Sequence, residues 1–306
     1  MPNPLKRWLP LVWLSIAGLA AWVLVTRLRT VAFGDVLSEL QALPGSIVIA
    51  GIICSTGVYV SIGLYEGIAV RLATGRSMRW HAFRTGITAN PIGRAIGVAM
   101  VSGGALRYRM YAPAGLSIGQ VGAVVLLISM PYFFGVGWLI DLSLLFHVDE
   151  ASTALRAPVD VVIVLGILGL MKDIGWLAFV WRQREPIVMM GQQLKLPDLR
   201  GALVQIAFGF VQISMMTAIL YLFMPPELGM SWPAFIPIYC IAFVAGQLSN
   251  VPVGLGVLEA ALLLMLPQVP PAKLLGAVVA YRAVYEILPL LAALASLLIY
   301  ESTHPA

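Results

Sequence analysis

Charged residues and cysteines are scarce in this sequence, and each shortage excludes a class of protein. Only 11% of the 306 residues are charged, whereas 60% are hydrophobic and the mean hydropathy is +0.93. A soluble domain carries about 25% charged residues, so an ordinary soluble globule is excluded. The two cysteines, Cys54 and Cys240, both lie within apolar segments, which excludes a disulfide framework and favours hydrophobic packing.

Catalytic and metal-binding signatures are also lacking. The three histidines, His81, His147 and His304, lie far apart in sequence, and no HExxH, CxxC or Walker A pattern occurs. The segment GLGVLE has the outline of a glycine-rich nucleotide loop, but no strand precedes it as such a loop requires. We therefore assign no catalytic residue, no metal and no cofactor, and we expect no direct nucleic-acid partner.

Long apolar runs recur along the whole chain. A run of about 20 apolar residues crosses the ~30 Å hydrocarbon core of a bilayer as a helix. The runs are continuous rather than alternating, which argues against a β-barrel. We predict one all-α polytopic membrane domain over residues 1–306, without a soluble synthase domain. Seven full spans are expected, at about 8–26, 44–70, 118–146, 158–181, 201–223, 233–250 and 274–299.

The distribution of lysine and arginine predicts the orientation of these spans. Cytoplasmic loops of membrane proteins are enriched in both residues. With a cytoplasmic N-terminus, the inner loops hold most of them, namely Lys6, Arg7, Arg71, Arg76, Arg79, Arg84, Arg182, Arg184, Lys195 and Arg200. The outer loops then hold Arg27, Arg29 and Arg156. We expect the N-terminus inside and Arg107 and Arg109 near the cytoplasmic face.

Two further apolar segments, at about 86–106 and 251–267, are short or broken by glycine. Irregular backbone at membrane depth is tolerated only where it is buried in protein or lines a wet cavity. The first segment contains ANPIGRAIG and the second SNVPVGLGVLE, each with one ionisable residue, Arg94 or Glu259. Such paired interruptions point to a transporter's binding site. They suggest an inverted pseudo-repeat, although so short a match also arises by chance.

The stretch SGGALRYRMYAPAGLS crowds polar residues behind a glycine pair, with Gly103, Gly104, Arg107, Tyr108, Arg109 and Tyr111 as its notable members. The two arginines are two residues apart, so on a helix they point to nearly opposite faces, and one can reach lipid phosphate while the other pairs inside the protein. The two tyrosines are three apart and share a face. One interpretation is anchoring at the membrane interface. The other is a lipid-headgroup site, in which the planar guanidinium binds phosphate, and the glycines favour it.

The segment from Ser249 to Leu266 is broken by Asn250, Pro252, Gly254 and Gly256. Glu259 then falls in the first turn of the resumed helix, where the helix dipole stabilises a carboxylate. Alternatively, this lone intramembrane acid faces a polar cavity and meets a cationic headgroup or a proton.

Charged residues also occur inside two other spans. The last span holds Tyr281, Arg282 and Glu286. Arg282 and Glu286 are four apart and can pair on one helix, or Arg282 can pair with Glu259 across helices. Lys172 and Asp173 lie mid-span between residues 158 and 181. As intramembrane charges, they are expected to face the bundle interior.

Three of these stretches, SGGALRYRMYAPAGLS, SNVPVGLGVLEA and AYRAVYEILPLL, together resemble the transmembrane region of the lysylphosphatidylglycerol synthases, or multiple peptide resistance factors. The same region occurs alone in uncharacterised inner-membrane proteins. The resemblance covers about residues 10–300 and implies a bacterial cytoplasmic-membrane flippase for aminoacylated phosphatidylglycerol, linked to antimicrobial peptide resistance. The positions that match the family are Arg107, Arg109, Asn250, Pro252, Gly254, Gly256, Glu259 and Arg282.

This sequence departs from the two-part members of that family, in which a cytosolic domain makes the lipid from aminoacyl-tRNA. It ends at Ala306 without such a domain, so lysyltransferase activity is not expected. Some relatives are linked to other lipids, such as hopanoids, and the headgroup therefore does not carry over.

We predict translocation of an anionic or aminoacylated phospholipid, such as lysylphosphatidylglycerol. The candidate substrate-binding residues are Arg94, Gly103, Gly104, Arg107, Tyr108, Arg109, Tyr111, Asn250, Pro252, Gly254, Gly256, Glu259, Tyr281 and Arg282. A charge network of Lys172, Asp173 and Glu286 is expected to accompany them. In this scheme Arg107 or Arg109 binds the phosphate and Glu259 attracts a cationic headgroup or couples to protons.

Two other functions stay open from the sequence. One is a non-transporting partner of a separate aminoacyl-lipid synthase, and the other is a membrane-embedded lipid transferase. Membrane phospholipids, such a synthase and further copies of the chain are the candidate partners.

Overall fold

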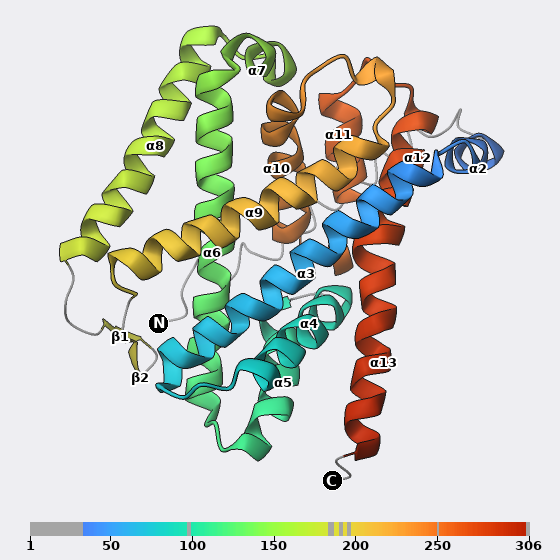
Figure 1. The fold of residues 1–306 in the computed structure, drawn as a ribbon. Coiled ribbons are helices and arrows are strands. Elements are labelled where there is room, and N and C mark those ends of the chain that lie inside the picture. Colours follow the sequence, from blue (N-terminus) through green and yellow to red (C-terminus); the bar gives the residue numbers. More distant parts are fainter. Residues whose placement is uncertain are drawn as a thin grey trace, which may run out of the picture.

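The computed structural model describes residues 33–96, 99–182, 187–189, 192–194, 197–249 and 251–303. These residues form a bundle of tilted helices with one small β-hairpin (Figure 1). The expected first span, 8–26, lies outside the described residues. The prediction of an all-α polytopic membrane protein is confirmed by the rest.

Five helical stretches of the described chain are long and apolar enough to cross a membrane. They are α3 (Gly45–Thr74), α6 (Ile118–Phe146), α8 (Val159–Arg182), α9 (Leu199–Phe223) and the continuous stretch Pro271–Ile299. At 1.5 Å per residue, even the 24 residues of α8 reach about 36 Å, more than the ~30 Å core requires. These stretches coincide with five of the expected spans.

The last stretch is built from three elements. It comprises α12 (Pro271–Arg282), the π-helix η4 (Ala283–Ile287) and α13 (Leu288–Thr303). The expected span 233–250 is the shorter helix α10 (Trp232–Leu248), which has 17 residues. Its length is marginal for a full crossing, because about 20 residues are needed.

The two interrupted segments both fold as short helices. In the first, α4 (Arg79–Ile96) packs against α5 (Ala99–Tyr111), which the turn η1 (Ala112–Ala114) follows. The second, 251–267, folds as the turn η3 (Pro252–Gly254) and the short helix α11 (Val257–Met265), which packs back against α10. We call these pairs the first and second hairpins. The first hairpin contacts the second through α4 and η3.

Short elements complete the described chain. Helix α2 (Phe33–Gln41) lies against α12, and α7 (Val148–Leu155) joins the ends of α6 and α8 (Figure 1). Strands β1 (Ile187–Met189) and β2 (Gln192–Leu194) pair antiparallel, and η2 (Pro226–Leu228) precedes α10. Hydrogen bonds from Ser231 to Glu150 tie α7 to the start of α10 and hold the pKa of Glu150 below its ordinary value.

Helix ends follow the local sequence. Helix α6 begins with a capping box, in which Ser117 and Gln120 each accept a hydrogen bond from the other's backbone N–H. Helix α9 begins at Asp198, whose side chain accepts from the Gly201 N–H, and α3 ends at Gly75 with φ 71°. These caps set where α6 and α9 begin and where α3 ends.

The closest helix crossing joins α6 to α9 and depends on glycine. A Cβ at Gly209 would overlap the carbonyl oxygen of Pro131, and one at Gly135 would overlap the backbone of Gly209. Small residues allow helix backbones to approach in membranes, where lipid tails remove the hydrophobic drive for association. This crossing therefore fixes α6 and α9 relative to α3, which packs on both.

Gly209→Ala is expected to destabilise the protein by about 1–3 kcal/mol, because the added methyl group has no room at the crossing. Gly122→Ala in α6 is the matched control, since a Cβ there meets nothing within 4 Å. Thermal unfolding in detergent, followed by the loss of the monodisperse peak, measures the difference. Equal midpoints for the two variants would contradict this account of the crossing.

Candidate functional site

The two hairpins meet at four charged side chains, which we call the central charge cluster: Arg94, Glu259, Arg282 and Glu286. Arg282 Nε lies 2.6 Å from Glu259 Oε1, and its Nη1 lies 2.8 Å from Glu286 Oε2. Arg94 Nη2 lies 3.4 Å from the other Glu286 oxygen. Their side chains are only 8–13% exposed. Two cations and two anions thus balance between α4, α11, α12 and the π-helix.

Glu259 does two things at once. One carboxylate oxygen accepts the backbone N–H of Gly256 at 2.9 Å and so caps the start of α11. The same carboxylate accepts both Nε and Nη2 of Arg282, at 2.6 and 3.0 Å. Arg282 also bonds Glu286, so the structure contains both ion pairs that the sequence offered as alternatives.

Arg282 also holds the interrupted backbone before α11. Its Nη1 donates to the carbonyl of Val253 at 3.1 Å, and its Nη2 to that of Gly254 at 3.4 Å. Val253 has φ 48°, a left-handed conformation that costs a β-branched residue of order 1–3 kcal/mol. Because a helix break leaves carbonyls without partners at membrane depth, the guanidinium supplies what the helix cannot.

The glycines of this turn serve close packing and unusual backbone angles. Gly254 has φ 62°, and a Cβ there would lie 2.8 Å from the Cα of Gly246 in α10. Gly256 has φ 80°. Pro252 opens η3. Asn250, another expected site residue, lies outside the described residues.

The π-helix joins the central charge cluster to neighbouring tyrosines. Arg94 Nη1 donates to the Tyr285 hydroxyl at 2.7 Å, and the Arg94 guanidinium lies 4.9 Å from the centre of that ring. The Tyr59 hydroxyl of α3 donates to the Tyr285 carbonyl at 3.1 Å. The hydroxyls of Tyr281 and Tyr239 are 2.7 Å apart. π-helical turns are often found at functional sites, and here the turn places Tyr285 and Glu286 side by side in the bundle.

Sequence reasoning named Tyr281 but missed Tyr285, Tyr59 and Tyr239. Tyr285 was within reach, because it lies four residues beyond Tyr281 in the stretch AYRAVYEILPLL. Tyr59 and Tyr239 lie in apolar runs of other helices and give no signal of their own.

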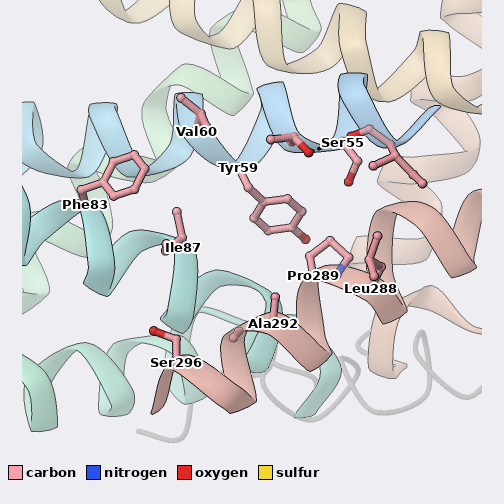
Figure 2. Close-up of a pocket in the computed structure, with 12 residues that line it drawn as sticks. Ser55, Tyr59, Val60, Phe83, Ile87, Leu288, Pro289, Ala292 and Ser296 are labelled. Carbon is pink, nitrogen blue, oxygen red and sulfur yellow. Dashed lines mark hydrogen bonds between the residues drawn. The ribbon is translucent and has the colours of Figure 1, made fainter. Parts of the chain in front are cut away.

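A groove of about 340 Å³ lies between α3, α4 and α13, and the ring of Tyr59 points into it (Figure 2). Its lining is mostly apolar, with hydroxyls at Ser55, Thr56, Tyr59 and Ser296. The Ser55 hydroxyl donates to the carbonyl of Val284 in the π-helix at 3.0 Å. The volume falls in the range of about 300–1,000 Å³ that is usual for ligand sites.

Arg107 is paired inside the protein, away from the central charge cluster. Its Nε and Nη2 donate to the two oxygens of Glu66 at 2.8 and 2.9 Å, and Tyr111 donates to the same carboxylate at 3.2 Å. Arg107 is 3% exposed and Glu66 is fully buried. Of the two arginines, Arg107 is thus the one that pairs inside the protein, which leaves phosphate binding by Arg109 a prediction. Glu66, a lone acid in an apolar run, carried the signal that sequence reasoning overlooked.

The rest of the stretch SGGALRYRMY also departs from expectation. Tyr108 is 41% exposed and Tyr111 fully buried, since a separation of three residues turns a helix by about 300° and the two straddle the buried edge. A Cβ at Gly103 would lie 3.1 Å from Arg107 Nη1 and 3.4 Å from the Ala89 carbonyl. Gly103 therefore makes room for α4 and Arg107, not for a ligand. Gly104 faces Val125, and Arg109 is exposed.

Lys172 and Asp173 form a separate group with Asp141 of α6. Lys172 Nζ lies 3.0 Å from Asp173 Oδ1 and 3.7 Å from Asp141 Oδ2. Asp173 is fully buried as expected, but the Lys172 side chain is 59% exposed, contrary to the expectation that both face the interior. The long lysine chain carries its ammonium to the edge of the helix pair. Within the described residues, no three side chains are arranged to hold a metal ion.

Membrane-length helices, two interrupted hairpins and balanced buried charges define a multi-pass α-helical membrane protein. The chain belongs to the family of "Uncharacterized protein slr0712" from Synechocystis sp., to which it is 32% identical over 219 residues, covering 71% of this chain and 67% of that protein. It is also similar to "Inner membrane protein YbhN" from Escherichia coli, at 29% identity over 218 residues, covering 66% of this chain and 64% of that protein. No protein-family model matches the chain.

The matched part thus spans about two thirds of each relative's own length. These relatives confirm the resemblance to stand-alone membrane proteins. The resemblance to lysylphosphatidylglycerol synthases stays a prediction.

Glu66→Gln is expected to destabilise the protein by about 3–5 kcal/mol, because it leaves the buried Arg107 charge without its partner. The double variant Glu66→Gln/Arg107→Gln should recover part of that loss, since no unpaired charge remains. Glu227→Gln, which breaks the surface pair with Lys273, is the control and should leave the unfolding midpoint close to that of wild type. Unfolding midpoints in detergent compare the three, and a double variant less stable than Glu66→Gln would refute the pairing argument.

Proposed function

We propose that this protein translocates a phospholipid with an anionic or aminoacylated headgroup, of which lysylphosphatidylglycerol is the leading candidate. The observation that carries the proposal is the central charge cluster, because it presents buried groups of both signs where the two interrupted hairpins meet. A headgroup with a phosphate and an ammonium needs both. Arg94 and Arg282 suit the phosphate, and Glu259 and Glu286 suit the ammonium.

The geometry singles out one ion pair for exchange with such a headgroup. Arg94 and Glu286 are 3.4 Å apart, the longest contact in the cluster, whereas Arg282 holds Glu259 by two short hydrogen bonds. A phosphate that replaces Glu286 on Arg94 leaves Glu286 to its second partner, Arg282. Arg282 is then shared by Glu259 and Glu286, and the ammonium of an aminoacylated headgroup supplies the second cation that keeps the site balanced at membrane depth.

The groove supplies the apolar half of the same substrate. Leu288 and Pro289 line it directly after the π-helix, while Glu286 of the π-helix belongs to the central charge cluster. Tyr285 joins the two, since its carbonyl accepts from Tyr59 in the groove and its hydroxyl accepts from Arg94. In our proposal one acyl chain lies in the groove while the headgroup passes the cluster.

We further propose a bacterial inner-membrane location with a cytoplasmic N-terminus. The relative YbhN is named as an inner membrane protein, and Arg71, Arg76 and Arg79 gather at the junction of α3 and α4, as cytoplasmic loops do. The membrane potential can drive a charged headgroup, because one charge crossing 100 mV is worth about 2.3 kcal/mol.

A leaflet-exchange assay tests the proposal. The purified protein is placed in liposomes that contain fluorescent phosphatidylglycerol or its lysyl derivative, and an impermeant quencher follows label in the outer leaflet. Arg94→Gln and Glu259→Gln are each expected to slow exchange at least ~10-fold, since each removes a charged hydrogen bond worth about 1.5–3 kcal/mol. Glu227→Gln, outside the cluster, should exchange like wild type.

Each result of this assay has a defined meaning. No exchange by folded wild type with either lipid would refute translocation of these lipids. Equal loss in Glu227→Gln would remove the specific role of the central charge cluster. Extracted lipid of unchanged mass is expected, and a product of altered mass would support a transferase instead.

Filling the groove tests its role without touching any charge. Ala292→Trp places a large ring among the groove residues, whereas Ala295→Trp places the same ring on an exposed position of α13 that does not line the groove. We expect slower exchange in the first variant and wild-type exchange in the second. Equal rates in both would mean that the substrate does not enter the groove.

A further inference from the structure

Helices α6 and α8 each carry a glycine followed four residues later by an aspartate, at the place where the two helices contact each other. The two stretches read GWLID from Gly137 to Asp141 and GLMKD from Gly169 to Asp173. The two helices lie side by side and are joined end to end through α7 (Figure 1). They therefore run in opposite directions, and the glycine of each pattern meets the aspartate of the other.

Each aspartate lies in the space that the opposite glycine leaves. A Cβ at Gly169 would overlap the carboxylate of Asp141, and one at Gly137 would lie 2.7 Å from Lys172 Nζ and 3.1 Å from Asp173 Oδ2. The Asp141 and Asp173 side chains are 8% and 0% exposed. Two carboxylates are thus enclosed within one helix pair, in a reciprocal arrangement that neither pattern alone reveals.

The charges of this group do not balance. Lys172 is the cation within ion-pairing distance of both carboxylates among the described residues. Asp173 Oδ2 accepts no hydrogen bond from any described residue, and neither does Asp141 Oδ2. With all three groups ionised the group carries a net charge of −1, whereas the central charge cluster carries none.

The helices that the structure describes around this group add no compensating cation. Helix α9 beyond Gly201 and the whole of α10 contain no Asp, Glu, Lys, Arg or His. On α3 and α5, Glu66 and Arg107 neutralise each other, while Arg71 and Arg109 lie near helix ends. Asp149 and Glu150 of α7 lie beyond the end of α6 and are acidic.

A net charge enclosed at membrane depth costs several kcal/mol, and binding one proton removes it. We propose that Asp141 and Asp173 share one bound proton and form an intramembrane proton site, distinct from the central charge cluster. A proton taken up from water bonds to one carboxylate, the resulting hydroxyl donates to the other, and Lys172 keeps its charge. The exposed side chain of Lys172 connects this buried group to the surface of the helix pair. This inference does not rest on lipid translocation.

Infrared spectroscopy of the protein in bilayers tests the proposal directly. At neutral pH, well above the value of about 4 at which an ordinary aspartic acid ionises, wild type should show the C=O stretch of a protonated carboxylic acid. Asp141→Asn and Asp173→Asn should each abolish it, because one remaining carboxylate is balanced by Lys172. In Lys172→Met the stretch should persist to more alkaline pH, since two carboxylates without the lysine hold the proton more tightly.

Glu286→Gln is the matched control, because it removes a buried carboxylate from a cluster whose charges already balance, and it should keep the band. A folded wild type without the band at neutral pH would overturn the proposal. So would a band that survives in either Asn variant, which would assign the proton to one residue alone, or a band lost in Glu286→Gln. If an Asn variant does not fold, the Lys172→Met titration decides, and an unchanged midpoint there refutes the shared proton.

Discussion

The arrangement of the two hairpins depends on the hydrogen bonds and ion pairs of the Arg282 guanidinium. The guanidinium holds Glu259 at the start of α11, Glu286 in the π-helix and two carbonyls of the broken turn before α11. Through Glu286 it reaches Arg94 of the first hairpin. In a medium without water, broken backbone and unpaired charge are both costly. One planar cation with several fixed donors offsets both costs at a single point.

The described part of the chain contains three groups of buried charged side chains, and their roles differ. Glu66 and Arg107 join α3 to α5, and both Glu66 oxygens and all three Arg107 guanidinium nitrogens already have hydrogen-bond partners within the protein. The central charge cluster is balanced but contains a longer, exchangeable pair between Arg94 and Glu286. The Asp141, Lys172 and Asp173 group is unbalanced. Charge balance and contact length thus separate a structural pair from a candidate substrate site and a candidate proton site.

The π-helix gives the proposed lipid site its two-sided character. An ordinary α-helix would continue from α12 into α13 without the extra residue that turns Tyr285 and Glu286 toward Arg94. The same segment presents its carbonyls to Ser55 and Tyr59 in the groove. Apolar and charged surfaces therefore meet across one turn, as an amphipathic substrate requires.

The sequence by itself determined five of the membrane spans and the two interruptions. Hydrophobic length alone predicts a crossing helix, and proline and glycine alone break one, so both signals are local. It also drew attention to Arg94, Glu259, Arg282 and Glu286, because ionisable residues stand out in apolar runs. It allowed one of Arg107 and Arg109 to pair inside the protein without saying which, and it named Gly103 as a candidate ligand contact, whereas the structure packs Gly103 against α4.

Only the tertiary structure decided which charges meet. Glu66 lies 41 residues from Arg107, and Arg94 lies 192 from Glu286, and such pairs depend on how each helix is rotated and where it crosses its neighbours. The groove, the tyrosines around the π-helix and the reciprocal setting of Asp141 and Asp173 depend on the same rotations. Local sequence sets the length and breaks of a helix, but the face that it buries is fixed by close packing against other helices, which no single stretch encodes.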